Sequence, residues 1–322
     1  MVITVLLAVV LLLGSWYAYR TAFYSPQAHR AQIEDPMEGD QYVDVTENIF
    51  RISHIMERIP HQQVTVKSHD GLTLYGRYYH VRDGAPLEIL FHGYRSHPYR
   101  DCSGGHALSR KMGFNALVVD QRAHGKSDGT TICFGIKERF DVLSWIHYAN
   151  DRLCGGSPII LSGLSMGAAT VLMSTSLELP ENVCCIIADS PFSAPSTIIE
   201  KVAADRHLPV ALCRPFIYLG AALYGRLNLL EMTAIRAVRN AKIPILLIHG
   251  EADRYVPYEM SLEICAACAS RVEVATFPYA GHGLCYMIDP KRYEQIVYDF
   301  LCSVPMLKDT IAPSFVKQLF EE

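Results

Sequence analysis

The sequence has 322 residues, of which 50% are hydrophobic and 19% are charged, and its formal net charge is −4. Such a chain can bury a full core as one large domain or two modest ones, and its composition is ordinary for a globular enzyme. The weakly acidic balance offers no basic field to a polyanion, so we expect no nucleic-acid partner. Ten scattered cysteines form no disulfide framework, and the Cys-x-x-Cys at 265–268 lacks the second pair of a zinc site, so we expect no metal.

The chain begins with an uncharged apolar run at residues 2–19. As a helix this run would be about 27 Å long, enough for the hydrocarbon core of a bilayer, and the aromatic residues at 16–19 suit a membrane interface. No basic residue precedes the run, so we favour an uncleaved single-pass anchor over residues 1–24, with a cleaved signal peptide as the alternative. Arg20 and Arg30 follow it, which by the positive-inside rule favours a cytoplasmic location for the C-terminal domain.

Residues 25–60 contain prolines and acidic residues and are predicted to form a linker followed by an amphipathic helix. The main folded domain is predicted over 61–303, and residues 304–322 are predicted to be a C-terminal tail. Every catalytic candidate described below lies after residue 90. We therefore expect a protein that begins near Gln27 to be soluble and active.

Two alternating runs, at 63–68 and 72–81, flank a turn and predict an antiparallel hairpin at the start of this domain. Six short apolar runs then follow at intervals, each leading into a loop and a helix-like segment. They are residues 87–91, 116–119, 159–161, 184–188, 243–248 and 272–277. This alternation predicts an α/β fold with a mostly parallel central sheet flanked by helices, whose ligand site lies beyond the carboxyl ends of the strands.

The most informative stretch is residues 158–170, PIILSGLSMGAAT. An apolar run predicted as a buried strand leads directly into Gly-x-Ser-x-Gly, and small residues predicted to begin a helix come next. This strand–turn–helix context is the one in which the motif forms a nucleophile elbow, with the serine on a strained turn. A chance match in a glycine- and serine-rich loop is the alternative. We predict that Ser165 is the nucleophile.

Acyl transfer at a serine requires two fixed N–H donors for the oxyanion. The backbone N–H of Met166, directly after Ser165, is one candidate. The loop after the first parallel strand reads His92-Gly93-Tyr94 and offers the N–H of Tyr94 as the second. A plain glycine turn is the alternative interpretation of this loop, and we expect His92 to be a structural hydrogen-bonding residue.

The general base and its carboxylate partner are predicted on the loops after the last two strands. His282 follows the run 272–277, and Asp253 follows the run 243–248, in the order Ser, Asp, His. Asp189 at the end of the preceding strand is a rival acid, and Glu251 is a neighbouring carboxylate.

Taken together, five motifs in this order resemble the α/β-hydrolase superfamily over about residues 60–303. They are His92-Gly93-Tyr94, Asp120-x-Arg122-x-x-Gly125-x-Ser127, Gly163-x-Ser165-x-Gly167, Gly250-x-x-Asp253-x-x-Val256-Pro257 and Gly281-His282-Gly283. The resemblance is to the branch that includes monoacylglycerol lipases and serine aminopeptidase-like proteins. It implies hydrolysis through an acyl-enzyme with no metal and no cofactor, and a helical cap inserted at about 190–240.

The sequence thus predicts a membrane-anchored serine hydrolase that cleaves carboxylic esters, with a small-molecule ester or acyl substrate. The anchor and an apolar stretch of the cap favour lipid-like esters. Peptide or amide hydrolysis is the first alternative, although the elbow GLSMG differs from the GGSWG typical of prolyl aminopeptidases of this fold. A non-catalytic binding module is the second, against which the complete triad argues.

Overall fold

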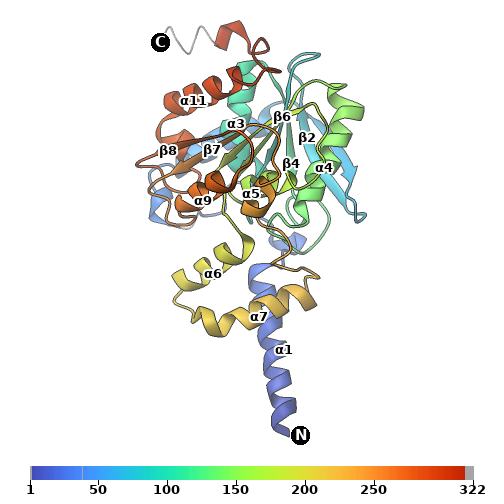
Figure 1. Cartoon of the computed structure of the whole chain (residues 1–322), viewed down its shortest axis with the longest axis vertical. Coiled ribbons are helices and arrows are strands. Elements are labelled where there is room, and N and C mark those ends of the chain that lie inside the picture. Colours follow the sequence, from blue (N-terminus) through green and yellow to red (C-terminus); the bar gives the residue numbers. More distant parts are fainter. Residues whose placement is uncertain (1, 38, 316–322) are drawn as a thin grey trace.

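One eight-stranded sheet organises the protein in the computed structural model, which describes residues 2–37 and 39–315 (Figure 1). The strand order is β1-β2-β4-β3-β5-β6-β7-β8, with β1 and β2 antiparallel to their neighbours and all other pairs parallel. The strands are β1 Gln62–Lys67, β2 Thr73–Tyr79, β3 Leu87–Phe91, β4 Asn115–Asp120, β5 Ile159–Leu164, β6 Val183–Asp189, β7 Ile245–Gly250 and β8 Val272–Phe277. The predicted hairpin and all six predicted parallel strands are present, so the predicted α/β-hydrolase fold is confirmed.

Helices cover both faces of the sheet, as a mostly parallel sheet requires (Figure 1). The helices α3 Pro98–Met112 and α11 Pro290–Cys302 share one apolar cluster with β5, β6 and β7. The opposite face is covered by α4 Glu138–Ala149, α5 Met166–Ser174, α8 Ala234–Val238 and α9 Glu259–Ala267, which share the largest cluster. A single turn of π-helix, Asn150–Cys154, ends α4, and the short helix α10 Cys285–Ile288 follows the loop after β8.

The predicted amphipathic helix of the linker is α2 Thr46–Arg58, which buries Ile49, Ser53 and Met56 on one side and packs against α3. Two short 3₁₀ turns, Gln27–His29 and Asp40–Tyr42, precede it. Residues 304–315, expected to be a tail, pack on the body, because Leu307 and Phe315 are buried in the cluster beneath α3 and α11. The rest of the predicted tail, residues 316–322, lies outside the described residues, as do residues 1 and 38.

A smaller helical part extends from one end of the sheet and consists of α1 Val2–Ala22, α6 Pro195–Asp205 and α7 Val210–Leu223 (Figure 1). The helix α7 runs across the second half of α1. At Gly220 the two backbones are so close that a Cβ would lie 2.3 Å from the carbonyl oxygen of Ser15, so this crossing requires glycine. The predicted cap of 190–240 also includes α8, but α8 packs against α5 and α9 of the body. We therefore assign α6 and α7 alone to the cap.

The helix α1 is the one helix among the described residues that is long and apolar enough to cross a membrane. Its C-terminal end is nevertheless attached to the body. Tyr19 and Phe23 are buried, and the backbone N–H groups of Ser25 and Ile132 bond the carbonyls of Thr130 and Phe23, each at 2.8 Å. The boundary expected after residue 24 thus falls inside a packed region.

Candidate active site

Ser165 occupies a sharp turn between β5 and α5. Its φ of 55° and ψ of −114° lie in a region of backbone conformation that residues other than glycine avoid. The backbone is held there by a hydrogen bond, because the N–H of Ser165 donates to the carbonyl of Asp189 at 2.8 Å. The turn also packs closely on β3, since a Cβ at Gly167 would lie 2.0 Å from the carbonyl oxygen of Phe91. Such strain is characteristic of functional turns, and here it presents the serine at the carboxyl edge of the sheet.

Three side chains predicted to act together meet at this edge. The Nε2 atom of His282 lies 2.9 Å from Oγ of Ser165, and its Nδ1 atom lies 2.7 Å from Oδ2 of Asp253. Because an ionised carboxylate only accepts, Nδ1–H donates to Asp253 and Nε2 is left to accept from the serine hydroxyl. The three come from loops after β5, β7 and β8, which parallel strands bring to one edge.

The electrostatics of the pair favour proton uptake at His282. Burial opposes charge on the ring, but the carboxylate of Asp253 outweighs it and raises the pKa of His282 above its ordinary value. Burial would likewise raise the pKa of Asp253, but the charge of His282 and hydrogen bonds to the carboxylate hold it well below the usual range. An imidazolium formed by taking the serine proton would therefore be stabilised where it forms.

The carboxylate of Asp253 is fixed by its own loop. Its Oδ1 accepts from the backbone N–H groups of Tyr255 and Val256, both at 2.8 Å. The buried ring of His249 lies behind it, with Nε2 3.3 Å from Oδ2 of Asp253 and Nδ1 2.7 Å from the hydroxyl of Ser261. Sequence reasoning missed His249, although its place at the end of β7 is a usable signal.

The two other carboxylates considered lie in different surroundings. Asp189 is next to the nucleophile, where its backbone carbonyl holds Ser165, its side chain accepts from the hydroxyl of Ser190 at 2.9 Å, and burial raises its pKa to about 6. Glu251 is exposed and accepts from the hydroxyl of Thr276 at 2.6 Å. The carboxylate on the His282 ring is that of Asp253.

The loop after β3 lies directly over the nucleophile. A Cβ at Gly93 would lie 3.4 Å from Cβ of Ser165, and the N–H of Gly93 donates to Asp101 at 2.7 Å. His92 has the structural role expected of it, since its Nε2 accepts from the N–H of Gln121 at 3.1 Å. The loop is therefore rigid beside the serine, as a donor for an oxyanion must be.

The two predicted oxyanion donors flank this contact. Tyr94 follows Gly93, and its phenol donates to the carbonyl of Ala22 on α1 at 2.8 Å while its ring stacks on Phe134. Met166 is the first residue of α5, and N–H groups in the first turn of a helix have no acceptor within the helix. The backbone of each is thus placed beside the serine, and their role as donors remains a prediction.

Two residues of the predicted linker also reach the site. The side-chain oxygen of Gln41 accepts from the N–H of His282 at 3.0 Å, and the phenol of Tyr42 donates to the carbonyl of His282 at 3.0 Å. These bonds hold the histidine loop from outside the sheet. Isolated polar residues in a linker carry no motif, so nothing in the amino-acid pattern marks them.

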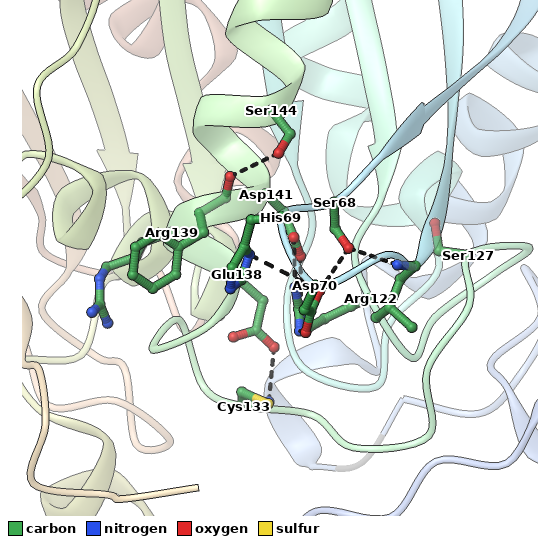
Figure 2. A network of polar contacts seen from close by, with 12 residues as sticks. Ser68, His69, Asp70, Arg122, Ser127, Cys133, Glu138, Arg139, Asp141 and Ser144 are labelled. Atoms are coloured by element: carbon green, nitrogen blue, oxygen red, sulfur yellow. Dashed lines mark hydrogen bonds and ion pairs between the residues drawn. The ribbon is translucent and has the colours of Figure 1, made fainter. Parts of the chain in front are cut away.

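The loop after β4 braces the body through an ion network that is buried at Arg122 and Asp141 and exposed at Asp70. The guanidinium of Arg122 contacts the carboxylates of Asp70 at 2.9 Å and Asp141 at 2.6 Å, as Figure 2 shows. His69, Asp70 and Asp141 are close enough together to hold a metal ion, but Arg122 already supplies a cation to both carboxylates. The network joins the β1–β2 turn to α4 and stands apart from Ser165.

A cavity of about 770 Å³ surrounds Ser165 and His282. One side is lined by the helical part, through Tyr17, Ala18, Thr21, Ile199, Val202 and Phe216. The other side runs between the sheet and α3 and α11, and is lined by Glu88, Leu90, Leu108, Met112, Ser162 and Val297. Glu88 is buried there, its pKa is raised by burial, and it accepts from the hydroxyls of Ser109 and Ser162. Most of the side chains named here are apolar and suit an apolar ligand, while charged groups such as Arg100, Asp101 and Asp189 also line the cavity.

The alpha/beta hydrolase family is matched over residues 89–296, about two thirds of the chain, and the protein belongs to this family. It is similar to protein YqkD of Bacillus subtilis, with 23% identity over 257 residues, 80% of this chain and 84% of that protein. Human protein ABHD12B is 26% identical over 258 residues, 74% of this chain and 62% of its own length. Among solved structures, an esterase of Pyrococcus furiosus aligns with a TM-score of 0.62 and 25% identity, over 76% of this chain and 93% of that one. The protein is thus an α/β-hydrolase.

Proposed function

We propose that this protein is a membrane-bound serine esterase with Ser165 as nucleophile, His282 as general base and Asp253 as the orienting acid. The observation that carries the proposal is the hydrogen-bonded series from Ser165 through His282 to Asp253, at 2.9 and 2.7 Å, on a strained serine. The esterase among the similar structures supports an ester substrate.

The reaction follows from these positions. The hydroxyl oxygen of Ser165 attacks the ester carbonyl while Nε2 of His282 takes its proton, and the oxyanion accepts from the N–H groups of Tyr94 and Met166. The C–O bond to the alcohol then breaks, and the alcohol leaves with the proton from His282. Water enters with His282 as base and releases the acid and the free serine. Asp253 stays ionised throughout.

The helix α1 supports a membrane location, with the hydrolytic body on one side of the bilayer. Of the two basic residues that argued for the cytoplasmic side, Arg30 donates to carbonyls of the loop after β4, at 2.8 Å from that of Gly125. Arg20 lies 4.2 Å from the ring centroid of Tyr24, just after α1. Both arginines keep their charge, so both support the cytoplasmic orientation. Carbonate extraction and sequencing of the N-terminus distinguish an anchor from a cleaved signal.

A fluorophosphonate probe tests the proposed nucleophile on the full-length protein. The wild type is expected to be labelled and to hydrolyse p-nitrophenyl esters, and Ser165→Ala is expected to lose both. Ser144→Ala, at a serine of α4 that is not among the residues lining the cavity, is the control and should still be labelled. Equal labelling of the wild type and Ser165→Ala would place the nucleophile elsewhere. An anilide with the same acyl group tests the amide alternative.

A further inference from the structure

Among the described residues, the part of α1 that contacts no other helix is too short to cross a bilayer by itself. Side chains are exposed without interruption only over residues 2–13. Twelve helical residues rise about 18 Å, whereas a hydrocarbon core is about 30 Å thick. From Gly14 onward one side of α1 is covered, because a Cβ at Gly14 would lie 2.5 Å from the ring of Phe216 on α7. If α1 spans the bilayer, α7 enters it too.

The outer face of α7 suits that environment. Leu212 is 69% exposed and Leu223 is 51% exposed, and eleven residues are about three helical turns, which places them on the same face. The helix contains a single charged residue, Arg214, and its guanidinium is paired with Glu200 of α6 at 2.7 Å. An exposed apolar face with its one charge paired is typical of a segment lying in the membrane interface.

The cavity reaches the surface between these two helices. Tyr17 of α1 and Leu208, just before α7, both line the cavity and are both exposed. Phe216 lines the cavity and also packs against α1. The wall between Ser165 and the outside is therefore built from the same two helices that carry the exposed apolar surface.

We propose that α7 lies in the bilayer beside α1, and that a lipid ester enters the cavity sideways between them, without passing through water. This inference rests on the proposed esterase function and specifies its substrate as an ester of one long acyl chain resident in the bilayer. A cavity of about 770 Å³ is within the range that encloses a single small molecule, which favours one chain. If a second copy of the protein covered the face of Leu212 instead, α7 would stay outside the bilayer. The free part of α1 would then be about 12 Å shorter than the hydrocarbon core.

Depth in the membrane is tested first. Leu212→Trp is compared with Leu262→Trp, a matched leucine that is 44% exposed on α9 of the body. Both full-length variants keep the native tryptophans and are reconstituted in phosphatidylcholine vesicles with brominated acyl chains. The added tryptophan at 212 should be quenched relative to unbrominated vesicles, and that at 262 should not. The proposal is wrong if the two added tryptophans are quenched to the same extent. It is also wrong if the tryptophan at 212 is not quenched and the wild type forms a stable dimer that Leu212→Asp dissociates.

Entry of substrate is tested next with Leu212→Asp and the control Leu262→Asp. A charge on the membrane face should lower the rate on a long-chain ester in vesicles by at least tenfold and leave the rate on soluble p-nitrophenyl acetate unchanged. The control should change neither rate. If the wild type hydrolyses neither ester, the proposed function fails. If it hydrolyses both and Leu212→Asp slows neither, sideways entry fails. If Leu212→Asp loses both rates, Leu223→Asp is measured in its place. It should likewise lower the rate on the long-chain ester and leave the rate on p-nitrophenyl acetate unchanged.

Discussion

The two sides of the cavity are built in different ways. On the body side, Ser165, Asp253 and His282 are placed by strand ends, and hydrogen bonds between their side chains align them for proton transfer. On the other side, the helices α1, α6 and α7 line the cavity with apolar side chains, and Gln41 and Tyr42 reach it from the linker through single hydrogen bonds. In the proposed function, the first side would carry out the reaction and the second would select the substrate.

The sharpest test of the body side is the identity of the acid. Asp253→Asn should lower kcat by about 10⁴-fold, as the equivalent change does in a serine protease triad, because an amide no longer fixes the tautomer of His282. Asp189→Asn should have a much smaller effect, since Asp189 holds Ser165 through its backbone carbonyl. Rates on p-nitrophenyl acetate, with circular dichroism to show folding, compare the two. A larger loss in Asp189→Asn would reverse the assignment.

Truncation of the N-terminus tests the side of the cavity that α1 helps to build. A protein that begins at Gln27 lacks Tyr19 and Phe23, which are buried against the body, and losing one buried phenylalanine side chain alone costs about 3–5 kcal/mol. We therefore expect the protein that begins at Gln27 to be less stable and less active, contrary to the expectation from sequence that it stays active. A protein that begins at Gly14 keeps these contacts and should retain its melting temperature and acetate hydrolysis. Equal stability of the two proteins would show that α1 is a detachable anchor after all.

The pH profile of the wild type sharpens the electrostatic part of the comparison. His282 acts as a base only when neutral, and Asp253 raises its pKa, so kcat/KM should rise with pH and reach half its maximum above about 6.5. In Asp253→Asn the cause of the raised pKa is gone, and this limb should move to lower pH. A limb that stays in place in the variant would mean that another group controls it.

The same contrast explains what the sequence could and could not predict. The parallel strands, the elbow and the three catalytic candidates were predictable because each depends on local pattern: an apolar run, a glycine-flanked serine, or a polar residue just after a strand. Gln41 and Tyr42 were not, because their partner lies about 240 residues away on the loop of His282. Nor was the attachment of α1, since an apolar helix that packs on protein and one that lies in lipid have the same composition.

The smallest expected effect concerns Glu88, a carboxyl buried in the body side of the cavity. Burial raises its pKa, so the folded protein holds this proton more tightly than the unfolded chain does. Its contribution to stability is therefore present at low pH and is lost as pH rises from its unfolded pKa, about 4.3, through its folded pKa. Glu88→Gln keeps a similar shape without the ionisation.

At neutral pH Glu88→Gln should be more stable than the wild type by about 1 kcal/mol, which is roughly 2–4 °C in Tm for a domain of this size. The difference should shrink towards pH 4, where Glu88 is protonated in both states. Glu251→Gln, at an exposed carboxylate on the loop after β7, is the control and should show no such dependence. Thermal melts from pH 4 to 8 measure both variants. A Glu88→Gln protein that is less stable than the wild type at every pH would mean that the charged carboxylate is accommodated by Ser109 and Ser162, and that the body side of the cavity is polar at neutral pH.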